Sequence, residues 1–140
     1  DRYFEVYPGV RTFLDRCIEW AHTKGYAITL YGRRRYTPDI ASSNFQKRSF
    51  AERVAMNHPM QGTAADIIKM AMVEVPKRIR KEGMKSKLIL QIHDELDFEV
   101  PRDEIDALSA LVKDTMEHIV ELKVPLIAEV SYGDNWAEAK

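Results

Sequence analysis

The sequence contains one cysteine, Cys17, and no apolar run long enough to span a membrane. One cysteine excludes an internal disulfide and a cysteine-rich zinc site, which is typical of a protein kept in a reducing compartment. Glycine and proline are also few, six of each in 140 residues, which excludes collagen-like and low-complexity chains. The first residues have neither the basic nor the apolar region of a signal peptide, so we expect a cytoplasmic protein without a membrane segment.

The net charge of −1 conceals an uneven distribution of charge along the chain. Residues 24–57 carry seven basic and two acidic side chains, and residues 77–93 carry six and one, so each segment has a net charge of +5. Residues 94–140 carry four basic and thirteen acidic side chains, a net charge of −9. Such basic segments indicate a polyanionic partner, and the alternative is that they pair with the acidic segment.

The spacing of apolar residues predicts an α+β domain with the order helix, hairpin, helix, helix, hairpin, helix, strand. A helix is expected to end before Gly25, with a short β-hairpin over 26–36 after it. Helices are predicted over 45–56 and 60–81, with a break or kink at Pro59. A hairpin over 88–100, a helix over 103–122 and a strand over 125–132 complete the order.

The tip of the second predicted hairpin carries His93, Asp94 and Glu95. Side chains at strand ends project outward, and carboxylates are the oxygen ligands that a hard divalent cation such as Mg²⁺ prefers. Asp94 and Glu95 are therefore candidate metal ligands. The alternative is a simple polar turn, in which Asp is a favoured residue.

Arg53, Asn57 and Gln61 recur at every fourth position. A row of long hydrogen-bond donors on one helix face suits a groove lined with acceptors, although the place of Gln61 depends on the break expected at Pro59. The alternative is a solvated helix face.

Three consecutive arginines, Arg33, Arg34 and Arg35, follow Gly32 in the first predicted hairpin. Guanidinium groups at the end of a strand are suited to clamp phosphates of a nucleic acid. The alternative is a set of surface ion pairs with the acidic C-terminal segment.

Several sequence blocks coincide, in order, with those of one known family. The blocks are Tyr3-Phe4 with Tyr7 to Val10, Thr29 with Gly32 to Arg35, Ala51 to Arg53, Asn57 with Pro59 to Asp66, Leu90 to Leu96, and Gly133 with Asn135-Trp136 and Glu138 to Lys140. Over essentially the whole chain, the sequence resembles the C-terminal part of the bacterial type of family A DNA polymerases.

The resemblance implies that residues 1–58 are the end of a fingers subdomain and residues 59–140 the C-terminal part of a palm subdomain. The hairpin at 88–100 would then carry the metal site. It further implies that Asp94 is a metal-binding catalytic aspartate, with Glu95 as the adjoining catalytic carboxylate. By the same resemblance, Arg53, Asn57, Gln61 and His93 lie near the primer terminus and the DNA minor groove.

The function implied by the resemblance is that of a DNA-directed DNA polymerase, a nucleotidyltransferase of replication and repair. Its cofactor would be Mg²⁺ in a two-metal site, its partners primer–template DNA and deoxynucleoside triphosphates, and its location the nucleoid of the bacterial cytoplasm. The family's other metal-binding aspartate and its nucleotide-gripping Lys and Tyr lie upstream of Asp1. Because the chain also has no initiator Met, we expect a fragment that is inactive alone.

The bare edge of the palm hairpin is further expected to pair with a second copy of the chain. Two other functions remain as alternatives at this point. One is a weak DNA-binding or structural module without activity, and the other is a metal phosphohydrolase built on the His93–Asp94 pair.

Overall fold

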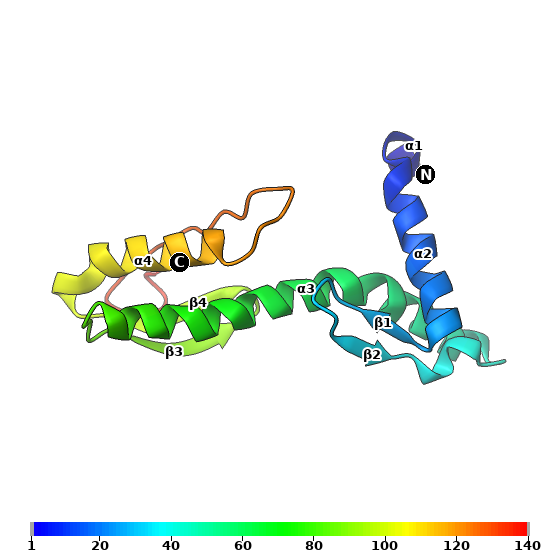
Figure 1. Cartoon of the computed structure of the whole chain (residues 1–140), viewed down its shortest axis with the longest axis horizontal. Helices are drawn as coiled ribbons and strands as arrows, with labels where there is room; N and C mark the ends of the chain where they lie inside the picture. Colours follow the sequence, from blue (N-terminus) through cyan, green and yellow to red (C-terminus); the bar gives the residue numbers. More distant parts are fainter. Residues whose placement is uncertain (1, 140) are drawn as a thin grey trace. The chain divides into compact units, whose positions relative to one another are not determined.

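The computed structural model describes residues 2–139, which form two compact units, residues 1–66 and 67–140 (Figure 1). Each unit combines helices with a two-stranded antiparallel sheet, which confirms the predicted α+β class. Among the described residues, no helix is both long and apolar enough to cross a membrane.

The first unit consists of short elements packed on the first half of a long helix. The elements are α1 (Arg2–Val6), α2 (Pro8–Lys24), β1 (Tyr26–Ile28), β2 (Arg34–Tyr36), the 3-10 helix η1 (Pro38–Ala41) and the start of α3 (Phe45–Lys81). The helix α2 ends as predicted, because Gly25 adopts a left-handed φ of 75° and its N–H bonds the carbonyl of Ala21 at 2.8 Å. The β1–β2 hairpin is also confirmed, with Tyr26 opposite Tyr36.

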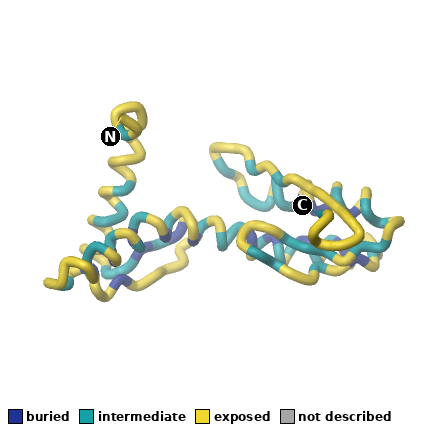
Figure 2. The backbone as a smooth tube through the Cα atoms, turned by 180° about the vertical axis from the view of Figure 1, so that it is seen from behind, coloured by how far each residue is buried: buried dark blue, intermediate teal, exposed yellow. Residues whose placement is uncertain are grey.

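Small side chains form the core of the first unit. Ala21 of α2, Ile40 of η1 and the α3 residues Ala51 and Ala55 make one buried cluster. Alanines allow these helices to approach α3 closely. By contrast, α1 buries no residue, and the N-terminal end of the chain is exposed along most of its length (Figure 2).

Of the break or kink predicted at Pro59, the break is wrong, because α3 is one continuous helix of 37 residues from Phe45 to Lys81. Proline in a helix interior removes one hydrogen bond and crowds the preceding turn, at a cost of about 3 kcal/mol. Contacts from the turn of the β1–β2 hairpin to Gly62 and Thr63 stabilise the helix around Pro59.

The second unit has a larger apolar core between α3 and the last helix. Its elements are the end of α3, β3 (Lys87–Ile92), β4 (Glu95–Glu99), the 3-10 helix η2 (Arg102–Glu104) and α4 (Ile105–His118). Its core contains Val75, Ile79, Leu108, Leu111 and Val112, with Met84, Phe98, Val100 and Met116 packed against it. The predicted hairpin over 88–100 is confirmed, except that a β-bulge between Leu88 and Leu90 interrupts the alternation.

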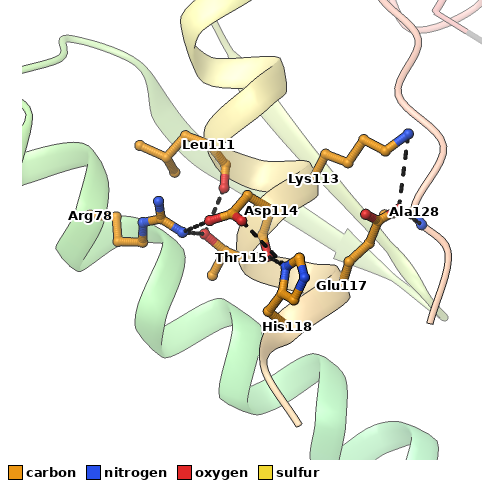
Figure 3. Close-up of polar contacts among 8 residues, drawn as sticks. All are labelled: Arg78, Leu111, Lys113, Asp114, Thr115, Glu117, His118 and Ala128. Atoms are coloured by element: carbon orange, nitrogen blue, oxygen red, sulfur yellow. Dashed lines mark hydrogen bonds and ion pairs between the residues drawn. The ribbon is translucent and has the colours of Figure 1, made fainter. Parts of the chain in front are cut away.

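Hydrogen bonds and an ion pair join α3 to α4 in this unit (Figure 3). Arg78 donates to Asp114 Oδ2 at 2.5 Å and to Thr115 Oγ1 at 2.8 Å. The Arg78 hydrogen bond lowers the pKa of the Asp114 carboxyl. Glu104 similarly accepts the Ser86 hydroxyl at 2.6 Å and the backbone N–H of Lys85 at 2.8 Å, and these bonds lower its pKa. Glu104 therefore fixes the chain just before β3.

Two further predictions for this unit are wrong. The helix predicted over 103–122 ends at His118, and residues 125–132 of the described chain form no strand. A strand needs a ladder partner, and two apolar side chains of this segment, Ile127 and Val130, are exposed. The backbone N–H of Ala128 bonds the side chain of Glu117 at 3.0 Å.

Candidate nucleic-acid interface and metal-binding hairpin

The continuity of α3 brings Arg53, Asn57 and Gln61 onto one exposed face of the helix. Residues four apart are neighbours on a helix surface, and eight residues rise by about 12 Å. The opposite face of the same turns is buried at Ala51, Ala55, His58 and Gly62. We call the exposed set, Arg53, Asn57 and Gln61, the donor row. The structure therefore brings together three residues whose alignment the sequence left dependent on Pro59.

The three consecutive arginines have different surroundings. The Arg33 guanidinium donates from Nε to Asp66 Oδ1 at 2.6 Å and from a terminal nitrogen to the Gly62 carbonyl at 2.8 Å. The Arg34 guanidinium lies over the Tyr26 ring, 4.7 Å from its centroid. The Arg35 side chain is exposed. Of the three, Arg33 thus forms an ion pair, and its partner belongs to α3 rather than to the acidic C-terminal segment.

The turn between β1 and β2, residues 29–33, is bonded to α3 at several points. The Leu30 N–H donates to Thr63 Oγ1 at 2.9 Å, and that hydroxyl in turn donates to the Pro59 carbonyl. His58 Nε2 lies 3.3 Å from the Arg33 carbonyl. Because a carbonyl only accepts, this Nε2 carries the proton. We call this set of contacts, from the turn 29–33 to residues 58–66, the turn–helix clip.

The clip stabilises the helical conformation around Pro59. Proline costs about 3 kcal/mol in a helix interior, and Gly62 costs about 1 kcal/mol relative to alanine. The four bonds from the turn, to Thr63, Asp66, Gly62 and His58, contribute about 1 kcal/mol each. The stabilisation from the clip therefore matches the intrinsic cost of these two residues.

The hairpin tip presents two carboxylates to solvent. Ile92 pairs with Glu95, so that His93 and Asp94 alone form the turn, and all three of His93, Asp94 and Glu95 are exposed. His93 has a φ of 52°, the left-handed region that few residue types other than glycine adopt. The Gln91 side chain donates to the His93 carbonyl at 2.6 Å and so secures the turn.

Glu95 also has a contact that periodicity did not reveal. The Trp136 indole N–H lies 3.4 Å from Glu95 Oε1, and in the same C-terminal segment Asp134 pairs with Arg102 at 2.7 Å. These bonds join residues far apart in sequence, as do the bonds from Arg33 to Asp66 and Gly62. No local spacing could have identified them.

The residues at the tip fit part of a metal site. Carboxylate oxygens are suitable ligands for Mg²⁺, and Asp94 and Glu95 provide them on a rigid turn. Over residues 2–139, however, no three His, Cys, Asp or Glu side chains converge to hold a metal. Within residues 2–139 the hairpin therefore offers two carboxylates, fewer ligands than a complete metal site needs.

Comparison with known proteins gives one consistent result. Residues 1–138 match the family model described as DNA polymerase family A. DNA polymerase I of Geobacillus stearothermophilus is 51% identical over 140 residues, and that of Bacillus subtilis 48%. Both alignments cover all of this chain but only 16% of the relative's length.

A solved structure agrees with the sequence matches. The POL domain of Pol1 from M. smegmatis, in complex with DNA primer-template and dNTP, superposes with a TM-score of 0.94 at 47% identity. The match covers 98% of this chain and 24% of that one. The fold described above is therefore one part of a larger polymerase domain in that protein.

Proposed function

We propose a function from one premise: this chain belongs to DNA polymerase family A. Within a DNA-directed DNA polymerase that contains it, the chain would carry one catalytic aspartate and a row of contacts to the primer–template. Residues 1–58 would be the end of the fingers and residues 59–140 the C-terminal part of the palm. The observation that carries the proposal is the exposed Asp94–Glu95 pair on the two-residue turn between β3 and β4.

Asp94 is the proposed metal ligand, and Glu95 is its adjoining carboxylate. Bound Mg²⁺ would activate the primer hydroxyl and neutralise charge on the transferred phosphoryl group. The Trp136 contact limits the rotation of Glu95, and the hairpin fixes the backbone at Asp94. This arrangement reduces the reorganisation needed when cations bind.

The donor row is proposed to contact the DNA minor groove, together with His93. Every Watson–Crick pair presents acceptors there at similar positions, whereas a mismatch displaces them. Arg53, Asn57 and Gln61 carry donor groups, and their side chains are exposed. These residues would therefore sense the shape of a correct pair without reading its sequence.

Two arginines of the β1–β2 hairpin, Arg34 and Arg35, are proposed to contact phosphates. Arg34 and Arg35 are exposed, and no acidic residue pairs with them in the contacts of the described chain. The sequence also predicted a phosphate contact for Arg33, but two of its nitrogens bond Gly62 and Asp66. The salt dependence of DNA affinity tests whether Arg33 makes that contact. Primer–template DNA and a deoxynucleoside triphosphate, both named for the M. smegmatis complex, are the proposed partners. In a bacterium, that substrate would localise the activity to the nucleoid.

The two alternative functions, a metal phosphohydrolase and a DNA-binding module, require different residues. A phosphohydrolase built on His93 and Asp94 would need a cluster of metal ligands, and residues 2–139 contain none. A DNA-binding module without activity would use the donor row but would not need Asp94. Removal of Asp94 therefore separates an enzyme from a module.

The test is Asp94→Ala in a polymerase that contains this chain, with Asp106→Ala on the exposed face of α4 as the control. Single-turnover nucleotide addition should fall by more than about tenfold in the first variant and remain unchanged in the second. The affinity for primer–template should stay close to that of the parent, because no phosphate donor is lost. Nucleotide addition by Asp94→Ala within about tenfold of the parent would refute the assignment.

A further inference from the structure

We propose that Arg33 is a positioning residue for Gln61, acting through the turn–helix clip rather than through a phosphate. The inference rests on the proposed function of Gln61 in the minor groove. It assigns a new role to Arg33, Asp66 and Thr63, which lie behind the donor row and need not touch DNA.

Gln61 lies in a turn of α3 that contains two residues poorly suited to a helix interior. Pro59 precedes it by two residues and removes a helical hydrogen bond, and Gly62 follows it directly and gives the backbone extra freedom. The side chain of Gln61 is exposed, and it can contact the DNA at a defined place only if this turn is rigid. Contacts from outside the helix add to the rigidity of this turn.

The Arg33 guanidinium provides that support on the C-terminal side of Gln61. One arm bonds the Gly62 carbonyl at 2.8 Å, and the other bonds Asp66 Oδ1 at 2.6 Å, one helical turn further on. The Asp66 side chain is only 11% exposed, so this ion pair is shielded from solvent on the acidic side. Such shielding strengthens a charged hydrogen bond.

Thr63 supports the same turn through its hydroxyl. It donates to the Pro59 carbonyl and accepts the Leu30 N–H at 2.9 Å. The turn 29–33 therefore contacts α3 after Gln61 through Thr63. It also contacts α3 before Gln61, where His58 Nε2 lies 3.3 Å from the Arg33 carbonyl. A flexible Gln61 turn would require these bonds to break together.

The bonds to Gly62 and Asp66 distinguish Arg33 from its sequence neighbours Arg34 and Arg35. A planar guanidinium fork reaches two acceptors at once, whereas a lysine ammonium at this position could not keep both bonds in the same geometry. A phosphate contact contributes about 0.9 to the slope of log affinity against log salt concentration. A positioning residue that neutralises no phosphate contributes no such slope, so salt dependence distinguishes the two roles.

The test uses single and double variants of a polymerase that contains this chain. The set is Gln61→Ala, Arg33→Ala, Arg33→Lys, Thr63→Val and Gln61→Ala combined with Arg33→Ala. The matched control is Arg11→Ala, which removes an exposed arginine paired with Asp15 at 3.1 Å in α2. The readouts are the ratio of matched to mismatched primer extension in single turnover, the salt slope of DNA affinity, and the melting temperature.

We expect Arg33→Ala to change the extension ratio by about two- to a hundredfold, the range for directly coupled residues, and Arg11→Ala to leave it unchanged. Thr63→Val, which preserves side-chain volume, should change the ratio in the same direction. The extension ratio of the double variant should be no further from that of the parent than the ratio of Gln61→Ala alone. Both substitutions remove the same contact, that of Gln61 with the minor groove. The salt slope should be that of the parent, and Arg33→Lys should recover only part of the ratio.

Other outcomes would overturn the inference in recognisable ways. Additive effects of Arg33→Ala and Gln61→Ala, or a salt slope reduced by about 0.9, would identify Arg33 as an independent phosphate contact. A lower melting temperature with an unchanged extension ratio would show a purely structural role. If Gln61→Ala alone left the ratio unchanged, the proposed function of Gln61 would fail, and the positioning role of Arg33 would fail with it.

Discussion

Replacement of Gly62 by alanine should destabilise the turn–helix clip, although alanine is the better helix former. A Cβ at this position would lie 2.6 Å from Thr29 Cγ2 and 2.9 Å from His58 Cε1. Both neighbours are buried, with exposed fractions of 4% for Thr29 and 6% for His58. The new methyl group therefore displaces side chains that have little room to move.

The expected loss of stability in Gly62→Ala is the sum of opposing contributions. Alanine favours the helix by about 1 kcal/mol, whereas overpacking of a buried contact costs about 1 to 3 kcal/mol. Rotation of Thr29 to relieve the clash would also disturb the bond from the Arg33 N–H to Thr29 Oγ1, which is 3.1 Å long, at about 1 kcal/mol. The net loss should be about 2 kcal/mol, or roughly a thirtyfold larger open population.

Hydrogen exchange measures that local opening directly. Peptides covering the turn 29–33 and residues 58–66 should exchange roughly thirtyfold faster in Gly62→Ala. Gly9→Ala is the matched control, because Gly9 also lies in a helix and a Cβ there meets nothing within 4 Å. Thr29→Ser should restore part of the protection in the Gly62→Ala background, since it removes Cγ2 and keeps the hydroxyl. Exchange in Gly62→Ala that is unchanged or slower would refute the close approach of the turn to α3.

The remaining predictions concern the donor row, one carboxyl group and the chain alone. Arg53→Ala should slow extension of a matched primer about five- to a hundredfold and change the penalty for a mismatched end, as single-turnover rates on both primers would reveal. Unchanged rates on both would exclude a minor-groove contact. Hydrogen bonds lower the folded-state pKa of Glu104, so its contribution to stability is complete above its unfolded pKa and is lost as pH falls through the folded pKa. Melting temperatures should therefore fall more steeply below about pH 4.5 for the parent than for Glu104→Gln, and parallel curves would contradict this. A polypeptide of these 140 residues should fold, bind primer–template with a shallow salt slope of about 0.9 per phosphate contact, and pair through the bare edges of β3 and β4. It should not extend primers, and extension that Asp94→Ala abolishes would place the whole active site within this chain.

Periodicity predicted most elements of the fold because their apolar faces are local. The helix α4 has regularly spaced buried positions, and both α4 and the β3–β4 hairpin were predicted within a few residues. The position of the turn at Asp94 could also be predicted from the sequence, because two strands so close together leave few other places for a turn. Prediction failed where distant residues decide the outcome.

Pro59 and residues 125–132 illustrate that failure in opposite ways. Local preference predicted a break at Pro59, and bonds from Leu30 and Arg33 to the following turn override it. Local preference also predicted a strand over 125–132, and no described strand pairs with it. The pairing of Arg33 with Asp66 spans 33 residues, so the sequence offered the charges but not the contact.

The left-handed backbone at His93 limits which amino acids can occupy this position. A φ of 52° excludes β-branched residues and is tolerated chiefly by Gly, Asn, Asp and His. Of these four, Gly has no side chain to donate a hydrogen bond, Asp is an acceptor when ionised, and Asn has a shorter reach than His. Library selection at position 93 should therefore return a very small set of residues, with Asn the main survivor besides His. A glutamine, which would preserve the donor, meets a penalty from the backbone alone, so the tolerance of this position is governed by main-chain geometry as much as by chemistry.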